Sequence, residues 1–170
     1  MQDRTSAVIS QARGETRRRN VSARRALTAK NGVGSFVLEE QVGFLLRAAS
    51  QRNTELFSQR MVAGLTRVQF TTLAKLLQIG SCSQNELGRL VLMDRATIKD
   101  VVSRLRKRGF IRVQPDAHDR RQHVLGLTRL GERTTRRAIA IAPGITEQML
   151  ERLSAAERKQ IIKLLCKIIM

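Results

Sequence analysis

The segment 83–127 carries a series of helix and turn signals that constrains the fold more than any other part of the chain. Ser83 and Glu86 have the spacing of a capping box, in which the serine oxygen accepts a hydrogen bond from an amide of the first helical turn. Asp94 marks the start of a second helix, which we expect to end at Gly109. These signals predict two consecutive helices with a short break between them.

A β-hairpin is predicted directly after the second helix. Strands over 110–113 and 123–127 flank a turn that contains Asp119, Arg120 and Arg121. Two helices followed by a hairpin form a winged helix-turn-helix, in which the second helix enters the DNA major groove. The predicted fold is therefore mainly α with a small β-wing, and double-stranded DNA is the expected partner.

The charge of the chain also favours a polyanionic partner. The sequence holds 32 Lys and Arg residues against 14 acidic residues, a formal net charge of +18. Residues 1–35 carry eight of these basic residues against two acids, and we interpret them as a basic N-terminal arm. No run approaches the ~20 apolar residues of a membrane span. We predict a cytoplasmic protein with no membrane partner.

Candidate catalytic and metal-binding groups are sparse. Cys82 and Cys166 lack the spacing of metal ligands, and we interpret them as reduced, packed thiols, with a redox switch as the alternative. His118 and His123 flank the predicted turn, where we expect no metal. No Ser-His-Asp, paired-carboxylate or phosphate-loop pattern stands out. We therefore predict neither an enzyme nor a bound cofactor.

Helices are also predicted on the N-terminal side of this segment. Apolar residues at helical spacing predict one long amphipathic helix over 36–61, ended by Gly64. Thr66 and Gln69 form a second capping box, which starts a helix that ends at Gly80. With the hairpin, this helix completes a DNA-binding part that we place at residues 66–127 and name the winged unit.

Two more helices are predicted on the C-terminal side. Thr128 opens one helix, which Pro143 and Gly144 are expected to kink or stop, because proline lacks an amide donor. Ser154 and Glu157 form a third capping box before the last helix. We expect residues 36–170 to form a single domain, with dimerisation helices over 36–64 and 128–170.

The last predicted helix carries an apolar stripe that a small domain cannot cover by itself. We expect the stripe to pack against a second copy of the chain, and a basic amphipathic membrane helix is the alternative. The predicted interface residues are Ile161, Ile162, Leu165, Ile168 and Ile169.

The second helix of the winged unit divides into two faces at about 100° per residue. Four apolar residues share the inward face: Ile98, Val101, Val102 and Leu105. Side chains near the start of such a helix reach base edges, so we expect Arg95 to read guanine and Ala96 or Thr97 to contact a thymine methyl group. The predicted DNA contacts of this helix are Arg95, Ala96, Thr97, Lys99, Asp100, Ser103, Arg104 and Lys107.

The predicted phosphate contacts and wing contacts complete this surface. Arg104, Arg106, Lys107 and Arg108 lie at the negative end of the helix dipole, and we expect them to bind phosphate. In the wing, Arg120 and Arg121 are candidates for insertion into a narrow minor groove, which concentrates negative potential. Asp119 would repel phosphate, so we expect it to orient an arginine.

Six short motifs carry a resemblance to a known family: Leu65–Phe70, Gln84–Leu87, Asp94–Thr97, Leu105–Ile111, Asp119–Arg121 and Leu127–Gly131. In these motifs the chain resembles the MarR/SlyA-type regulators, over roughly residues 37–170. The resemblance implies a homodimer built from the N- and C-terminal helices. It also implies binding to pseudo-palindromic operators, with repression that a small-molecule effector relieves.

The resemblance further implies an effector site between the dimerisation helices and the winged unit. In this sequence the implied site residues are Phe44, Arg47, Arg60, Phe70 and Leu73. An arginine beside phenylalanines would suit an aromatic carboxylate or its coenzyme A thioester. The long basic arm departs from the family pattern.

One alternative function stays open at the level of the sequence. The net charge of +18 and the basic arm also fit a nonspecific architectural or nucleoid DNA-binding protein. The two functions differ in specificity, because a regulator should prefer its site by ~10³ or more over random DNA.

Overall fold

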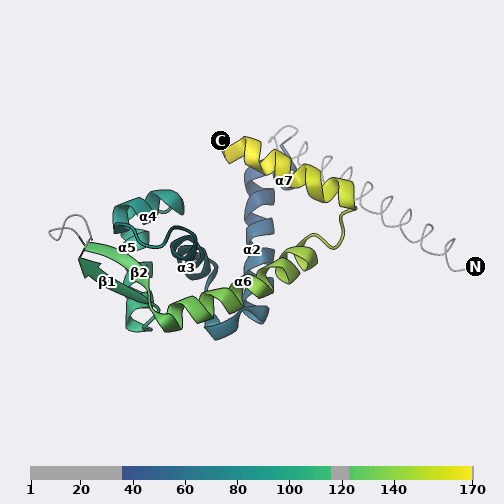
Figure 1. Ribbon diagram of the computed structural model, residues 1–170. Helices are drawn as coiled ribbons and strands as arrows, with labels where there is room; N and C mark the ends of the chain where they lie inside the picture. Colours follow the sequence, from purple (N-terminus) through teal and green to yellow (C-terminus); the bar gives the residue numbers. More distant parts are fainter. Residues whose placement is uncertain (1–35, 116–122, 170) are drawn as a thin grey trace, which may run out of the picture. The chain divides into compact units, whose positions relative to one another are not determined.

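A computed structural model describes residues 36–115 and 123–169 of the 170-residue chain. The described residues fall into two compact units that divide after Ser50. They are mainly helical with one two-stranded antiparallel sheet, so the predicted fold class is confirmed (Figure 1). In chain order the elements are η1 (Leu38–Glu40), α2 (Val42–Arg60), η2 (Val62–Gly64), α3 (Arg67–Ile79), α4 (Gln84–Leu90), α5 (Arg95–Lys107), β1 (Ile111–Pro115), β2 (His123–Leu127), α6 (Arg129–Met149) and α7 (Ala155–Ile169).

The helices begin at the side-chain caps that the sequence predicted. The Thr66 hydroxyl accepts a hydrogen bond from the Gln69 amide at 3.3 Å, and the Gln69 side chain accepts one from the Thr66 amide at 3.1 Å. Ser154 and Glu157 form the same reciprocal pair before α7. Each cap provides an acceptor for an amide that has no partner within its helix. At α4 the structure shows one half of the predicted box, in which the Ser83 hydroxyl accepts from the Glu86 amide at 3.2 Å. Single caps start α5 and α6, at Asp94 and Thr128.

The predicted continuous helix over 36–61 is wrong in its first part, because Gln41 interrupts it. Gln41 has extended backbone angles, φ −78° and ψ 128°, and separates η1 from α2. Its side-chain amide donates to the Val37 carbonyl at 3.2 Å, and its backbone amide donates to the Leu38 carbonyl at 3.0 Å. Local hydrogen bonds therefore compete with the helix that the apolar spacing indicates.

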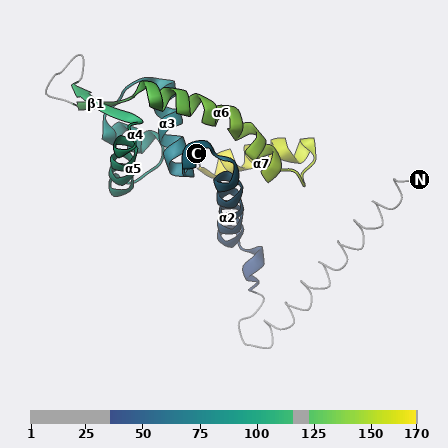
Figure 2. The ribbon, with the colours of Figure 1, turned by 90° about the horizontal axis from the view of Figure 1, so that it is seen from below.

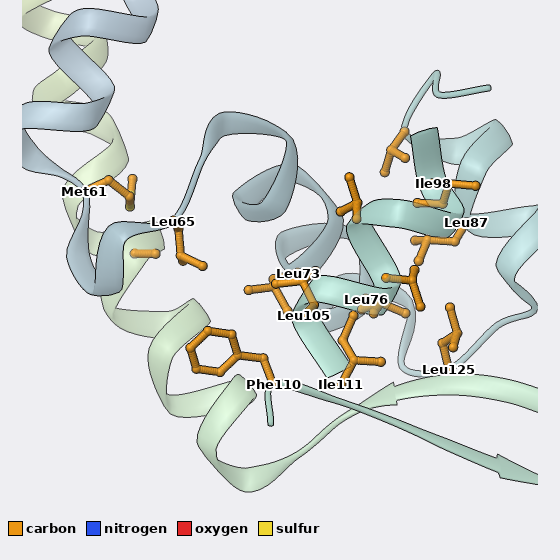
Figure 3. Packing of buried hydrophobic residues seen from close by; sticks show 14 of the residues in the cluster. Met61, Leu65, Leu73, Leu76, Leu87, Ile98, Leu105, Phe110, Ile111 and Leu125 are labelled. Carbon is orange, nitrogen blue, oxygen red and sulfur yellow. The ribbon is translucent and has the colours of Figure 1, made fainter. Parts of the chain in front are cut away.

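The core of the winged unit lies where α3, α4, α5 and the hairpin meet. Leu73 and Leu76 of α3 and Leu87 of α4 are completely buried, as is Leu105 of α5 (Figure 3). Burying each of these side chains stabilises the fold by about 1.5–3 kcal/mol. Because three helices share this core, it fixes the position of α5 relative to its neighbours.

The two helices of the helix-turn-helix pack closely against each other (Figure 2). Gly88 of α4 permits the close approach: a Cβ atom at this position would lie 3.2 Å from Ile98 Cγ2 and 3.3 Å from the Met93 carbonyl oxygen. In the turn between the helices, Leu92 has a φ of 55°, in the left-handed region that L-residues rarely occupy.

The hairpin is attached to the helix-turn-helix by backbone hydrogen bonds. In the β1–β2 register, Val113 pairs with Leu125. Leu125 also pairs with Cys82, just before α4: the Leu125 amide donates to the Cys82 carbonyl at 2.8 Å, and the Cys82 amide donates back at 3.2 Å. The base of the wing is thus held to the start of α4 as well as to β1.

The junction between the hairpin and α6 gives a physical reason for Thr128 and Gly131 in the motif Leu127–Gly131. The Thr128 hydroxyl donates to the Gly109 carbonyl at 2.6 Å and accepts from the Gly131 amide at 3.0 Å. Gly131 packs on the Phe110 backbone so closely that a Cβ atom would lie 2.0 Å from the Phe110 carbonyl oxygen. Threonine and glycine at these positions therefore set the start of α6 against the end of the helix-turn-helix.

Pro143 does not stop α6, which continues to Met149. Of the two expected outcomes, a kink or a stop, the stop is wrong, because packing holds the helix on both sides of the proline. Ala138 before it and Ile145 after it are both buried. Tertiary contacts therefore outweigh the loss of one helical hydrogen bond.

Among the described residues, no helix combines the length and the apolar character that a membrane span requires.

Candidate DNA-binding surface and effector pocket

Helix α5 separates core residues from exposed residues as its sequence predicted. The four inward residues are between 0% and 5% exposed, so their predicted burial is confirmed. The eight predicted DNA contacts of α5 all lie on its exposed surface. The predicted wing residues Asp119, Arg120 and Arg121, and also His118, lie outside the described residues.

The start of α5 holds Thr97 in a defined orientation. One Asp94 carboxylate oxygen accepts from the Thr97 amide at 2.8 Å, and the other accepts from the Thr97 hydroxyl at 2.7 Å. These hydrogen bonds, led by the hydroxyl, lower the pKa of Asp94. The Thr97 hydroxyl proton is thereby engaged, and its methyl group and oxygen lone pairs are available to a DNA base.

Asp100 and Arg104 form an ion pair one turn apart on the exposed surface of α5. The Arg104 Nε donates to Asp100 Oδ1 at 3.1 Å, and Arg104 Nη2 lies 3.0 Å from Asp100 Oδ2. An exposed pair of this kind contributes little to stability. It orients the guanidinium, and the charges of these two side chains balance each other.

Arg108 points back into the protein, and the expectation that it binds phosphate is wrong. Its guanidinium donates to the Gln69 side-chain oxygen at 3.1 Å and to the Ala63 carbonyl. It also lies over the Phe110 ring, 4.8 Å from the centroid. The half-buried Arg108 therefore joins the end of α5 to the start of α3 and is a structural residue.

A basic hollow near the start of α5 includes residues that sequence reasoning missed. It has a volume of about 530 Å³. Its lining is Ser83, Asn85, Gly88, Arg89, Met93, Arg95 and Ile98. Asn85 and Arg89 are one turn apart on α4 and therefore share a helix face, but this spacing does not relate them to Arg95 on α5.

A smaller pocket of about 280 Å³ lies among α2, α3 and α6. Its lining is Asn53, Phe57, Arg67, Phe70, Thr71, Ala142, Ile145 and Thr146. The Phe57 and Phe70 rings are 5.6 Å apart at their centroids and tilted by 55°. The pocket thus combines an aromatic wall with an arginine, an amide and two hydroxyl groups.

Of the five residues that the resemblance suggested for an effector site, only Phe70 lines this pocket. Leu73 is completely buried in the core, and Arg60 donates to the Gly144 carbonyl at 3.4 Å. Phe44 and Arg47 belong to the N-terminal unit, where the guanidinium lies 5.2 Å from the ring centroid.

Asn53 and Arg67 were missed as lining residues of the pocket. Each precedes a phenylalanine of the pocket by one helical turn: Asn53 before Phe57 and Arg67 before Phe70. Residues at this spacing share a helix face, so the positions of Phe57 and Phe70 in the sequence could have identified Asn53 and Arg67 as their neighbours.

Helix α7 leaves its apolar residues uncovered. None of its described residues is buried. Of the predicted interface residues, Ile161 is half-buried and the other four are 40–70% exposed. An exposed apolar stripe of this length marks an interaction surface.

The cysteines differ in their surroundings. Cys82 is buried, and burial, with a smaller effect of the nearby Glu86 carboxylate, raises the pKa of its thiol to about 11. Cys166 is half-buried on α7, and neither cysteine is in a disulfide. Within the described ranges, no group of three or more His, Cys, Asp and Glu side chains is placed to hold a metal ion.

A helix-turn-helix with an exposed polar reading face, followed by a hairpin, defines the class of winged DNA-binding proteins. The model of the MarR family matches residues 65–123. The HTH-type transcriptional repressor NicR of Pseudomonas putida is 41% identical over 135 residues, covering 79% of this chain and 85% of NicR. The chain belongs to the MarR family and is a DNA-binding transcriptional regulator.

Solved structures agree with this assignment. A probable transcriptional regulator from Pseudomonas aeruginosa is 41% identical, with a TM-score of 0.75, over 78% of this chain and 99% of that protein. BpsR of Bordetella bronchiseptica, whose DNA binding is regulated by 6-hydroxynicotinic acid, is 35% identical. Its TM-score is 0.74, over 79% of this chain and 97% of BpsR.

Proposed function

We propose that the protein is a homodimeric repressor that leaves its operator when a small aromatic acid binds to the pocket among α2, α3 and α6. The observation that carries this proposal is the pairing of an aromatic wall with the Arg67 guanidinium in that pocket. In this proposal the protein catalyses no reaction and regulates transcription by binding operator DNA and the effector. It does so in the cytoplasm, where its operator DNA lies.

The dimer in this proposal is supported by the exposed apolar stripe of α7. Four of its residues are 40–70% exposed, and a second copy of the chain would cover them. A two-fold dimer presents two copies of α5 to DNA. Its operator is then a pseudo-palindrome, with half-sites about one helical turn apart.

The chemistry of the pocket favours an aromatic carboxylate. Phe57 and Phe70 provide an apolar wall on which a ring can stack, and Arg67 can bind a carboxylate through two parallel hydrogen bonds. A pocket of about 280 Å³ suits a single ring, so the free acid fits better than its coenzyme A thioester. Regulation of BpsR by 6-hydroxynicotinic acid points to the same class of effector.

The test begins with the full chain and a random DNA library at physiological salt. Selection should enrich an inverted repeat, and the selected duplex then serves as the operator in fluorescence anisotropy. We expect 6-hydroxynicotinic acid or benzoic acid to lower the operator affinity at least tenfold. Recovery of duplexes without a motif would support the architectural function and contradict a specific repressor.

Variants of the pocket separate effector binding from DNA binding. Arg67→Gln should weaken the response to the acid about tenfold and leave the affinity for DNA unchanged, because the pocket that Arg67 lines contains none of the predicted DNA contacts. Arg133→Gln, on the exposed surface of α6, is the matched control for loss of one positive charge. An equal response to acid in both variants would contradict this pocket as the effector site.

A further inference from the structure

We infer that Asn53 selects effectors whose aromatic ring carries a hydroxyl group in addition to the carboxylate. The inference rests on the proposed function and deepens it, because it names the subclass of aromatic acid that the pocket among α2, α3 and α6 favours. Asn53 lines this pocket from α2, and Arg67 lines it from α3. A ligand in the pocket therefore has an amide within its walls as well as a guanidinium.

The Asn53 carboxamide is a polar group that the protein itself leaves unused. The side chain is half-buried, and among the described residues it has no hydrogen-bond partner. By contrast, the Thr146 hydroxyl of the same pocket already donates to the Ala142 carbonyl at 3.3 Å. Asn53 can therefore offer two donors and one acceptor to a ligand.

Asn53 and Arg67 reach the pocket from different helices. Each precedes one phenylalanine of the aromatic wall by one turn, and the rings of Phe57 and Phe70 are 5.6 Å apart at their centroids. A ring that lies on this wall with its carboxylate at Arg67 presents another of its edges to α2. The hydroxyl group that Asn53 recognises is therefore remote from the carboxylate, at position 3 or 4 of a benzoic acid.

Contacts between α2 and α6 hold the backbone of Asn53 in place. Arg52, the preceding residue, donates to the Glu151 carboxylate at 3.1 Å. Further along α2, Arg60 donates to the Gly144 carbonyl at 3.4 Å. Asn53 thus lies on a stretch of helix that is attached to α6 at both ends. A carboxamide on such a stretch needs little reordering to bind a ligand, which favours selectivity.

The selectivity follows from the cost of leaving the carboxamide without a partner. A ring that lacks a polar substituent would displace water from Asn53 and return no hydrogen bond. A hydroxyl group both donates and accepts, so it replaces that water. A site that can hydrogen-bond a ligand hydroxyl rejects the analogue that lacks it. We expect a preference of about tenfold for the hydroxylated acid.

The test measures binding of benzoic acid, 3-hydroxybenzoic acid and 4-hydroxybenzoic acid to the full chain by isothermal titration calorimetry. The wild-type chain should bind at least one hydroxylated acid about tenfold more tightly than benzoic acid. Asn53→Leu keeps a similar side-chain volume but removes the donors and the acceptor. This variant should keep the affinity for benzoic acid and bind the hydroxylated acid within about twofold of it.

Two further variants provide the controls. Asn53→Ala removes the same polar groups and should also lose the preference, so the test does not depend on the folding of one variant. Gln59→Leu removes a carboxamide from the exposed surface of α2, outside the pocket, and should keep the preference. The inference is overturned if the wild-type chain binds the three acids equally, or if the Asn53 variants keep the preference.

Release of the selected duplex, followed by fluorescence anisotropy, separates this inference from the proposed function. Acids that bind with the expected preference but leave the affinity for DNA unchanged would contradict the repressor proposal alone. Acids that release the duplex without any preference among them would contradict the inference alone. If none of the three acids binds, the effector pocket is wrong and the inference that rests on it is overturned as well.

Discussion

Helices α5 and α7 each carry an apolar face, but only α5 covers that face within its own chain. The inward residues of α5 are 0–5% exposed, whereas Ile162, Leu165, Ile168 and Ile169 of α7 are 40–70% exposed. The winged unit is therefore complete as a single chain, while α7 presents a surface that needs a partner. This difference supports the proposal that α5 contacts DNA and that α7 associates with a second copy of the chain.

The largest expected effect comes from charging the surface of α7. Ile162→Asp combined with Leu165→Asp should give a monomer, because two carboxylates would lie in a desolvated interface. With one reading helix in place of two, the affinity for the selected duplex should fall by about 100-fold or more. Sedimentation measures the oligomeric state, and anisotropy measures the affinity.

The control for this variant is Gln160→Asp, which adds a negative charge away from the stripe by helical spacing. It should leave both the oligomeric state and the affinity unchanged. A dimer that persists in the double variant would show that the exposed apolar stripe of α7 is not the dimer interface.

The next effect tests how closely α6 packs on the end of the winged unit. Gly131→Ala should lower the free energy of unfolding by about 3 kcal/mol, because the new Cβ would lie 2.0 Å from the Phe110 carbonyl oxygen. Gly144→Ala is the matched control, since its Cβ would meet only the end of the Arg60 side chain at 3.6 Å. That variant should be neutral or more stable by about 0.5–1 kcal/mol. Urea unfolding that shows equal effects for both would refute the close packing at Gly131.

Local signals explain why most element boundaries of the winged unit were predictable from sequence. The Thr66 box, the Asp94 cap and the Thr128 cap act within one helical turn, so neighbouring residues in the sequence determine them. The inward face of α5 was also predictable, because the helical period decides which residues share a face.

Long-range contacts explain what the sequence did not reveal. Arg108 binds Gln69 and the Ala63 carbonyl, 39 and 45 residues away, and nothing near Arg108 in sequence indicates this. Pro143 carries a strong local stop signal, which packing of α6 on both sides overrides. The pocket draws residues from three helices, and helical spacing alone relates residues only within each helix.

The buried Cys82 thiol gives the winged unit a dependence on pH. Its pKa is raised to about 11 in the folded chain from an ordinary value of 9.0, because burial disfavours the thiolate. The stability from this group is fully present below pH 9 and is lost as pH rises toward 11, since the unfolded thiol ionises first. Urea unfolding between pH 8 and pH 11 should show a steeper decline for the wild-type chain than for Cys82→Ala.

Alkylation provides an independent check on the same thiol. At pH 8, iodoacetamide should modify native Cys82 at least about 100-fold more slowly than Cys82 in the urea-unfolded chain, as a two-unit pKa difference implies. Equal rates in the native and unfolded chains would show that Cys82 is accessible and ionisable in the native fold.

The smallest expected effect concerns Leu92, an exposed apolar residue that belongs to the winged unit and not to α7. It is 82% exposed and has a φ of 55°. Leu92→Gly should relieve about 1–2 kcal/mol of left-handed strain, partly offset by about 0.5–1 kcal/mol of extra chain entropy in the unfolded state. We therefore expect a net stabilisation of about 0.5 kcal/mol in urea unfolding, with the dimer intact.

Leu92→Ala separates the backbone from the side chain at this position. Alanine keeps the Cβ atom and therefore the strain, so removing the exposed side chain should change the stability very little. If Leu92→Ala instead dissociated the dimer, as charging α7 should, then exposed apolar residues of the winged unit would also form an interface. The proposal that α7 alone forms the dimer interface would then be wrong, because the winged unit would also contribute to it.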